Sequence, residues 1–179
     1  MKIESLSNVG VFVRDHKKAK DFYTKKLGLK IRSSITKWEY LELGATKGGE
    51  DASLNLWRPT REMWGEDYGE AEKSIGSVTG IGFLTTNLTA TLESFRRKKV
   101  KIEGPGPAGR AQIATVYDPD GNSLFVLEPP KPKVRRTGLL SLQMVTVASR
   151  DAARAGEFFT KSLGMRGGRS DEEGMRFYR

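Results

Sequence analysis

The sequence Phe22-Tyr23-Thr24-Lys25-Lys26-Leu27-Gly28-Leu29 returns later in the chain as Phe158-Phe159-Thr160-Lys161-Ser162-Leu163-Gly164-Met165. In both copies an Asp stands seven residues before the first Phe, as Asp15 and Asp151. A hydrophobic run with strand character precedes each Asp. Internal repetition of this kind indicates a fold that is built by duplicating one supersecondary unit.

A weaker third copy lies between these two. The run Ile-Gly-Phe-Leu at residues 81–84 is followed by Asn87 and a helical pattern. The repeated unit is therefore predicted to be a strand, a capped helix and further strands. The elements expected in the first unit are strand 4–13, the helix from Asp15 to Gly28, strands 30–34, 37–43 and 52–57, and a long charged loop at 58–76.

The second unit is predicted to repeat this order. Its expected elements are strand 77–85, helix 88–99, a short strand 100–103, a Gly- and Pro-rich loop 104–110, strand 112–117, the turn Asp118-Pro119-Asp120-Gly121-Asn122 and strand 123–127. In that turn, Pro presets one backbone dihedral and Gly adopts a positive φ. We expect a domain of two units at residues 1–129, a basic Pro-rich linker at 130–138, and a partial third unit at 139–179.

The third unit is about half as long as the first. It is predicted to contain strand 139–148, a helix over about 150–163 and a strand near 174–178. Because the remaining strands of the repeat are missing, its sheet cannot be complete within itself. Exposed sheet edges invite pairing with another chain.

The composition narrows the possible functions. The chain of 179 residues has no cysteine, which excludes disulfides, thiolate nucleophiles and Cys-ligated metals. No signal peptide or membrane-spanning run is present in the sequence, so we expect a cytoplasmic protein that does not enter a membrane. The net charge of +9 favours an anionic partner, but the basic residues are spread along helices and no nucleic-acid-binding motif accompanies them. Specific nucleic-acid binding is therefore not expected.

The paired strand–helix–three-strand units, with an aromatic pair in the helix, Leu-Gly after it and Asp-Pro-Asp-Gly-Asn before the last strand, resemble the vicinal oxygen chelate superfamily. This group includes glyoxalase I, extradiol dioxygenases and bleomycin-binding proteins. The resemblance covers residues 4–129 well and 139–178 in part. It implies an α+β fold in which paired βαβββ units form curled mixed sheets around a cleft, followed by a partial third unit.

Enzymes of this family hold one divalent metal in that cleft, on the first and last strand of each unit. The resemblance places the four ligand positions at Asn8, Asn55, Gly80 and Phe125. Two neutral amides, a bare backbone and a benzyl group lack the charge that such an ion requires. No metal site, catalytic residue or cofactor is therefore expected. The matching position in the third unit is Met144, so that unit does not supply the missing donors.

Metal-free members of the family use the cleft as a ligand pocket. Residues expected to line it here are Asn8, Trp38, Tyr40, Asn55, Trp57, Arg110, Tyr117 and Phe125. The aromatic side chains would stack on a planar ligand. Arg110 would hold an anionic group. His16, the only histidine, is interpreted as a surface residue of the first helix.

The first hypothesis is a metal-independent small-molecule-binding protein, expected to be a homodimer, whose ligand is planar or anionic. The alternative is a divergent or truncated glyoxalase-like lyase or extradiol dioxygenase-like enzyme with a relocated metal site. That site would require Glu39, Glu42, Glu128 or carboxylates from a partner chain to converge in the cleft. A third hypothesis is that the partial third unit pairs with its counterpart in another subunit, or with a separate chain.

Overall fold

The computed structural model describes residues 5–49, 51–170 and 176–178. The chain divides into two compact units. One comprises Ser7–Thr146, and the other comprises Val147–Arg179 together with Met1–Leu6. The larger unit contains both complete copies of the repeat, and the smaller one contains the helix of the third copy.

The first repeat forms a four-stranded mixed sheet in the order β1-β4-β3-β2. The strands are β1 (Asn8–Phe12), β2 (Lys30–Ile35), β3 (Tyr40–Gly44) and β4 (Ser53–Trp57). Strands β1 and β4 are parallel, and the other neighbours are antiparallel. Helix α1 (His16–Asp21) continues into a π-helical turn, η1 (Phe22–Lys26), and begins where the Asp15 side chain accepts a hydrogen bond from the Lys18 backbone.

The second repeat forms a five-stranded mixed sheet in the order β6-β7-β8-β5-β9. Its elements are β5 (Val78–Leu84), α4 (Leu88–Arg97), β6 (Lys101–Ala108), β7 (Ala111–Tyr117), β8 (Ser123–Glu128) and β9 (Ser141–Val145). Strand β9, which was expected to open the third unit, pairs antiparallel with β5. The prediction of a loop over residues 104–110 was wrong for most of that range. Strand β6 continues to Ala108 and pairs with β7, with a shift in the register of the pairing.

Two further expectations in the first repeat were also wrong. The strand expected at 37–43 begins only at Tyr40, because Thr36–Trp38 forms a 3-10 helix that ends at Glu39 with a φ of 43°. The expected loop 58–76 is largely helical, with α2 (Arg61–Trp64), η3 (Gly65–Asp67) and α3 (Tyr68–Lys73). Thr60 caps α2 by accepting a hydrogen bond from the Met63 backbone, a signal that the charged composition obscured.

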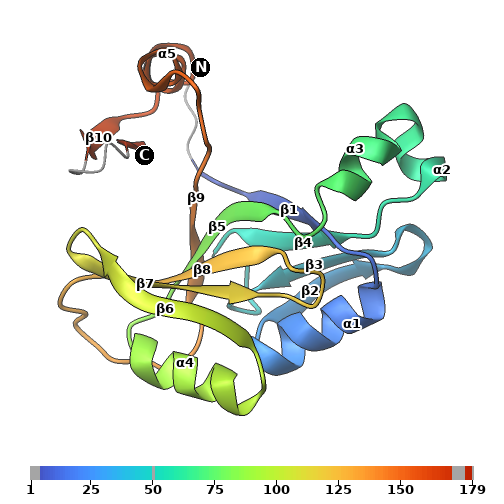
Figure 1. The fold of residues 1–179 in the computed structure, drawn as a ribbon, viewed down its shortest axis with the longest axis horizontal. Coiled ribbons are helices and arrows are strands. Elements are labelled where there is room, and N and C mark those ends of the chain that lie inside the picture. Colours follow the sequence, from blue (N-terminus) through green and yellow to red (C-terminus); the bar gives the residue numbers. More distant parts are fainter. Residues whose placement is uncertain (1–4, 50, 171–175, 179) are drawn as a thin grey trace. The chain divides into compact units, whose positions relative to one another are not determined.

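One hydrophobic core lies beneath both sheets, on the side where α1 and α4 pack (Figure 1). Alternate strand residues enter it, as Leu54 and Leu56 do from β4. The end of η1 also contacts the residues that follow α4, since Lys26 donates to the Lys99 carbonyl and Lys98 donates to the Lys26 carbonyl. The two repeats are therefore packed together as one α+β body.

The smaller unit repeats the local structure of α1 closely. It contains α5 (Ala152–Glu157), the π-helical turn η4 (Phe158–Ser162) and the antiparallel pair β10 (Gly167–Ser170) and β11 (Arg176–Tyr178). Asp151 caps α5 as Asp15 caps α1. The predicted repeat is thus confirmed in its backbone. The strand expected near 174–178 lies partly outside the described residues.

Candidate functional site

The candidate site is the face of the first sheet that points away from the core, which we call the non-core face. Strand pairing places Asn55 of β4 between Gly10 of β1 and Glu42 of β3. One step along the sheet, Trp57 lies between Phe12 and Tyr40. Because side chains alternate along a strand, these residues share the face opposite Leu54 and Leu56.

Four rings form an aromatic cluster on this face: Phe12, Tyr40, Trp57 and Trp64. The Tyr40 and Trp57 ring centroids are 4.5 Å apart, with their planes tilted by 50°. Trp64 of α2 packs edge-on against Phe12 at 4.8 Å and against Trp57 at 6.3 Å. Edge-to-face pairs at such distances are favourable because of the ring quadrupoles. The four rings are half-buried and pack against one another on this face.

Phe12 and Trp64 were not among the residues expected from the sequence. Trp64 was missed because α2 had been assigned to a loop. Phe12 was missed because its place opposite Trp57 follows only from the register of β1 and β4. For Trp64, the available sequence signal was Thr60, which can cap a helix that contains Trp64.

Polar atoms surround the aromatic cluster. The Trp64 Nε1 atom is buried and has no hydrogen-bond partner among the described residues. The Asn55 side chain is 8% exposed, and its Oδ1 accepts a hydrogen bond from the Ser53 hydroxyl at 3.4 Å. Burial, with the nearby charge of Glu42, raises the pKa of Tyr40, so its phenol is a neutral donor at physiological pH. An acceptor atom on a ligand would give the Trp64 indole N–H the hydrogen-bond partner that it lacks among the described residues.

The four family ligand positions do not fit a divalent metal. Asn8 is exposed, and its amide donates to the neighbouring Ser7 hydroxyl. Gly80 has a φ of 70°, and a Cβ built there would lie 2.2 Å from the Thr146 carbonyl oxygen, so no donor side chain can occupy the position without moving the backbone. Within the described part of the chain, no three His, Asp or Glu side chains come together as metal donors. The chemistry of this donor set remains that of neutral amides and hydrocarbon.

In the second sheet, the side chain of Met144 lies over Gly82 of β5. A Cβ built on Gly82 would lie 2.4 Å from the Met144 side chain and 3.7 Å from Phe125. Met144 comes from β9, whose register places it directly opposite Gly82. The side chains of Met144 and Phe125 therefore make this part of the second sheet apolar.

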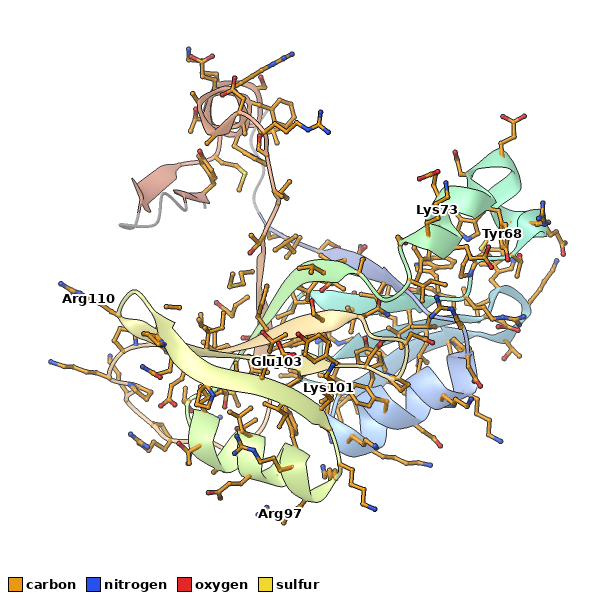
Figure 2. All side chains as sticks on the ribbon, viewed as in Figure 1. Tyr68, Lys73, Arg97, Lys101, Glu103 and Arg110 are labelled. Carbon is orange, nitrogen blue, oxygen red and sulfur yellow. The ribbon has the colours of Figure 1, made fainter. Side chains whose placement is uncertain are left out.

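The remaining expected residues lie apart from the cluster. Trp38 is in the 3-10 helix and is 48% exposed rather than on β3 as expected. Arg110 is in the exposed turn between β6 and β7, at the far end of that hairpin (Figure 2). Tyr117 donates to Glu103 at 2.6 Å, and the Lys101 Nζ lies 4.5 Å from the centroid of its ring. The structure thus brings together Tyr40, Asn55 and Trp57, but not Trp38, Arg110 or Tyr117 with them.

The carboxylates considered for a relocated metal site do not converge. Glu39 forms an ion pair with Arg58 at 2.7 Å. The Glu128 Oε2 atom accepts a hydrogen bond from the Leu88 backbone at the start of α4. Glu42 remains on the non-core face, beside Asn55 in the register of β3 and β4.

Two βαβββ units with these sheet orders define a glyoxalase-like fold. Residues 5–126 match the Glyoxalase/Bleomycin resistance protein/Dioxygenase superfamily. The chain belongs to this superfamily. Across the described ranges, every helix is too short or too polar to cross a lipid bilayer.

Individual relatives include both an enzyme and a binding protein. The chain is 29% identical over 151 residues to a protein of Arabidopsis thaliana named "Probable lactoylglutathione lyase, chloroplastic". That match covers 80% of this chain but only 39% of the relative. Among solved structures, TnmS3, an antibiotic binding protein from Streptomyces sp. CB03234, is 26% identical with a TM-score of 0.56, over 72% of this chain and 98% of TnmS3. Glyoxalase I from Zea mays has the same fold, with a TM-score of 0.65 at 20% identity, over 92% of this chain and 56% of that one.

Proposed function

We propose that the protein binds a planar small molecule on the non-core face of the first sheet, without a metal ion. The observation that carries this proposal is the aromatic cluster beside Asn55, at the place where the family's enzymes require charged metal ligands. Aromatic side chains with a few well-placed polar groups are the usual lining of small-molecule sites. The likeness to an antibiotic binding protein supports a binding role.

The roles of the individual residues follow from their contacts. Trp57 is central, because it contacts both Tyr40 and Trp64. Its ring would stack on the ligand. The indole N–H of Trp64 and the amide of Asn55 would supply directional hydrogen bonds to carbonyl or hydroxyl groups. An anthraquinone or flavonoid dye has this combination of a planar ring system and polar substituents.

Fluorescence titration with a panel of such dyes tests the proposal. All three tryptophans lie within Ser7–Thr146, and two of them belong to the aromatic cluster. We expect saturable quenching that becomes at least about tenfold weaker in Trp57→Phe, a loss of about 1.4 kcal/mol. Trp38→Phe is the matched control, because Trp38 lies outside the cluster and should leave the affinity unchanged. Equal affinities in the two variants would contradict the assignment of this face.

Metal independence needs its own measurement. Purified protein is analysed for bound elements and then titrated with nickel, zinc, iron and manganese ions. We expect neither a stoichiometric metal nor a change in dye affinity after treatment with chelator. A tightly bound metal at one equivalent would overturn this part of the proposal.

A second candidate is a glyoxalase-like lyase, which is favoured by the likeness to the plant protein and by Glu42 on the same face. The chain covers well under half of that relative, so the rest of such a site would have to come from elsewhere. Turnover of a methylglyoxal–thiol adduct that is lost in Glu42→Gln would support this candidate. Absence of turnover across the metal panel would remove it.

We further propose that the protein is a cytoplasmic homodimer. Strand β1 pairs with β4 on one edge only among the described residues, whereas its counterpart β5 is paired on both edges, with β8 and β9. An edge strand with unpaired backbone groups favours association. Sedimentation equilibrium is expected to give twice the chain mass of 19.9 kDa, and a monomer at all concentrations would refute the proposal.

A further inference from the structure

A basic pocket of 640 Å³ lies at one end of the first repeat. It is lined from four sides: by residues just before and within α1, by the end of β2, by the 3-10 helix Thr36–Trp38, and by Arg58 after β4. None of its lining residues belongs to the aromatic cluster. Its volume is within the range of about 300–1,000 Å³ that is typical of small-molecule sites.

Four cations line this pocket, Arg14, Lys17, Lys20 and Arg58, together with two anions, Asp15 and Glu39. Arg14 also lies 3.9 Å from the carboxylate of Asp120, which is not part of the lining, so the unpaired positive charge belongs to Lys17 and Lys20. Both carboxylates are already engaged: Asp15 caps α1, and Glu39 accepts from Arg58 at 2.7 Å. No carboxylate among the described residues lies within ion-pair distance of Lys17 or Lys20. A surplus of positive charge on converging side chains attracts an anion.

Neutral donors complete the lining. Ser34 of β2 and Thr36 of the 3-10 helix also line the pocket, and both carry a hydroxyl group. Hydroxyl, ammonium and guanidinium groups are the side chains that bind phosphate oxygens. Arg58 is held in place by its ion pair, so its guanidinium is already oriented.

His16 also lines the pocket, in contrast to its interpretation as an ordinary surface residue. Its Nε2 atom is buried and has no hydrogen-bond partner among the described residues. Burial lowers the pKa of His16, and Lys20 lowers it further, while Glu39 and Asp15 oppose this effect. The imidazole is therefore neutral at physiological pH, and a bound anion would both favour its protonation and accept a hydrogen bond from it.

We propose that this pocket binds the phosphate group of a small molecule. Lys17 and Lys20 supply the net charge. Arg58, Ser34 and Thr36 supply the directed hydrogen bonds. The site is separate from the planar-ligand site proposed above, so either proposal can fail alone.

The single histidine provides a direct probe. The imidazole signals of His16 in a proton–nitrogen NMR spectrum are followed while inorganic phosphate or sulfate is added to the whole protein. The double variant Lys17→Gln/Lys20→Gln tests the pocket. The matched control is Lys47→Gln/Lys133→Gln, which removes the same charge from two exposed lysines that do not line it.

We expect a saturable shift of the His16 signals in the wild type. The affinity for the added anion should be at least about tenfold weaker in Lys17→Gln/Lys20→Gln, a loss of about 1.4 kcal/mol, and unchanged in the control. Non-saturating shifts, or equal weakening in both double variants, would reduce the effect to general ionic screening and overturn the proposal. Failure of all dye binding would leave this result untouched.

A pH series adds an independent readout. Sulfate keeps its charge over the pH range in which histidines titrate, and the pKa of His16 is lowered from its ordinary value of 6.5 by burial. Because the bound anion stabilises the protonated imidazole, affinity for sulfate is expected to rise as the pH falls through the pKa of His16. His16→Gln should remove that rise, measured by calorimetry. A pH profile that is identical in the variant and the wild type would contradict a role for His16 in the pocket.

Discussion

The substitution Tyr23→Phe removes one hydroxyl from the junction between the two repeats. Tyr23 of η1 is fully buried, and its hydroxyl donates to the Asp118 carboxylate at 3.0 Å. Asp118 also accepts from the Asp120 backbone and from the backbone and side chain of Asn122. The Asn122 amide in turn donates to the Phe12 carbonyl of β1. This network is how the Asp-Pro-Asp-Gly-Asn turn of the second repeat is attached to the first.

The magnitude follows from the burial of both groups. The phenyl ring keeps its packing in the variant, so the loss is confined to one of four hydrogen bonds to a buried carboxylate. A hydrogen bond to a charged group contributes about 1.5–3 kcal/mol. With three donors retained, we expect a loss of about 2 kcal/mol in the free energy of unfolding. For a chain of this size that lowers the melting temperature by roughly 4–8 °C.

Urea denaturation followed by tryptophan fluorescence measures the change, because the three tryptophans report on the unit that contains Tyr23. Tyr117→Phe is the control, since Tyr117 also donates to a carboxylate, that of Glu103, but at an exposed site. Water replaces an exposed hydrogen bond, so the control should show no measurable change. If both variants shifted the midpoint equally, burial would not be the reason for the effect.

The pH dependence gives a second check on Tyr23. Burial, and then the charge of Asp118, raise its pKa well above the ordinary value of 10.0. The unfolded chain therefore releases this proton first, and the stability that it contributes is full below pH 10.0 and is lost as the pH rises above it. The wild type should lose stability faster than Tyr23→Phe above that pH. Parallel curves would refute the argument.

Three further predictions concern stability. Asp51→Asn breaks an ion pair with Arg32 in which the Asp51 side chain is 5% exposed and the Arg32 side chain 9% exposed. The free energy of unfolding, measured by urea denaturation, should fall by about 3–5 kcal/mol. Lys73→Gln, which breaks an exposed ion pair with Glu70, should cause no measurable loss. Although burial alone would raise the pKa of Asp51, hydrogen bonds from Thr46 and Ala45 and the charge of Arg32 lower it. Wild-type stability should therefore fall as the pH drops below 3.8, and Asp51→Asn should show a smaller fall, because the pKa of Asp15 is also lowered and that group remains. Gly80→Ala adds a Cβ against the Thr146 carbonyl at a φ of 70°, so it should cost more than about 1 kcal/mol and speed hydrogen exchange in β9, while Gly48→Ala, with nothing within 4 Å, should not.

Much of the local structure could be predicted from the sequence. Asp15, Asn87 and Asp151 each precede a helix and cap it as expected, because capping depends on residues three positions away. The Asp-Pro-Asp-Gly-Asn turn was predicted from the backbone dihedrals that Pro and Gly favour, which are also local properties. The superfamily was predicted from the repeated units and their motifs. The 3-10 helix before β3 and the helices after β4 were not predicted, since short apolar patterns among charges are ambiguous.

The site depended on longer-range information. Tyr40 and Trp57 were expected in the cleft as aromatic residues of its strands, and Asn55 as a ligand position implied by the resemblance. Phe12 joins them only through the pairing of β1 with β4. Trp64 reached the same face from a segment beyond β4. The pocket around His16 combines residues that lie up to 44 positions apart, from Arg14 to Arg58, and no sequence pattern groups them.

The two copies of the repeated helix show which features depend on the local sequence and which depend on tertiary packing. The sequence alone predicted a capped helix from Asp15 to Gly28 and a second copy over about 150–163. Both copies also share a π-helical turn, in which the Leu backbone N–H donates to the carbonyl of the first Phe. Tertiary structure decided the rest: Phe22 is 4% exposed in the core, whereas its copy Phe158 is 52% exposed. Backbone hydrogen bonds and caps are satisfied by near neighbours, but burial depends on which distant strands are present to cover a side chain.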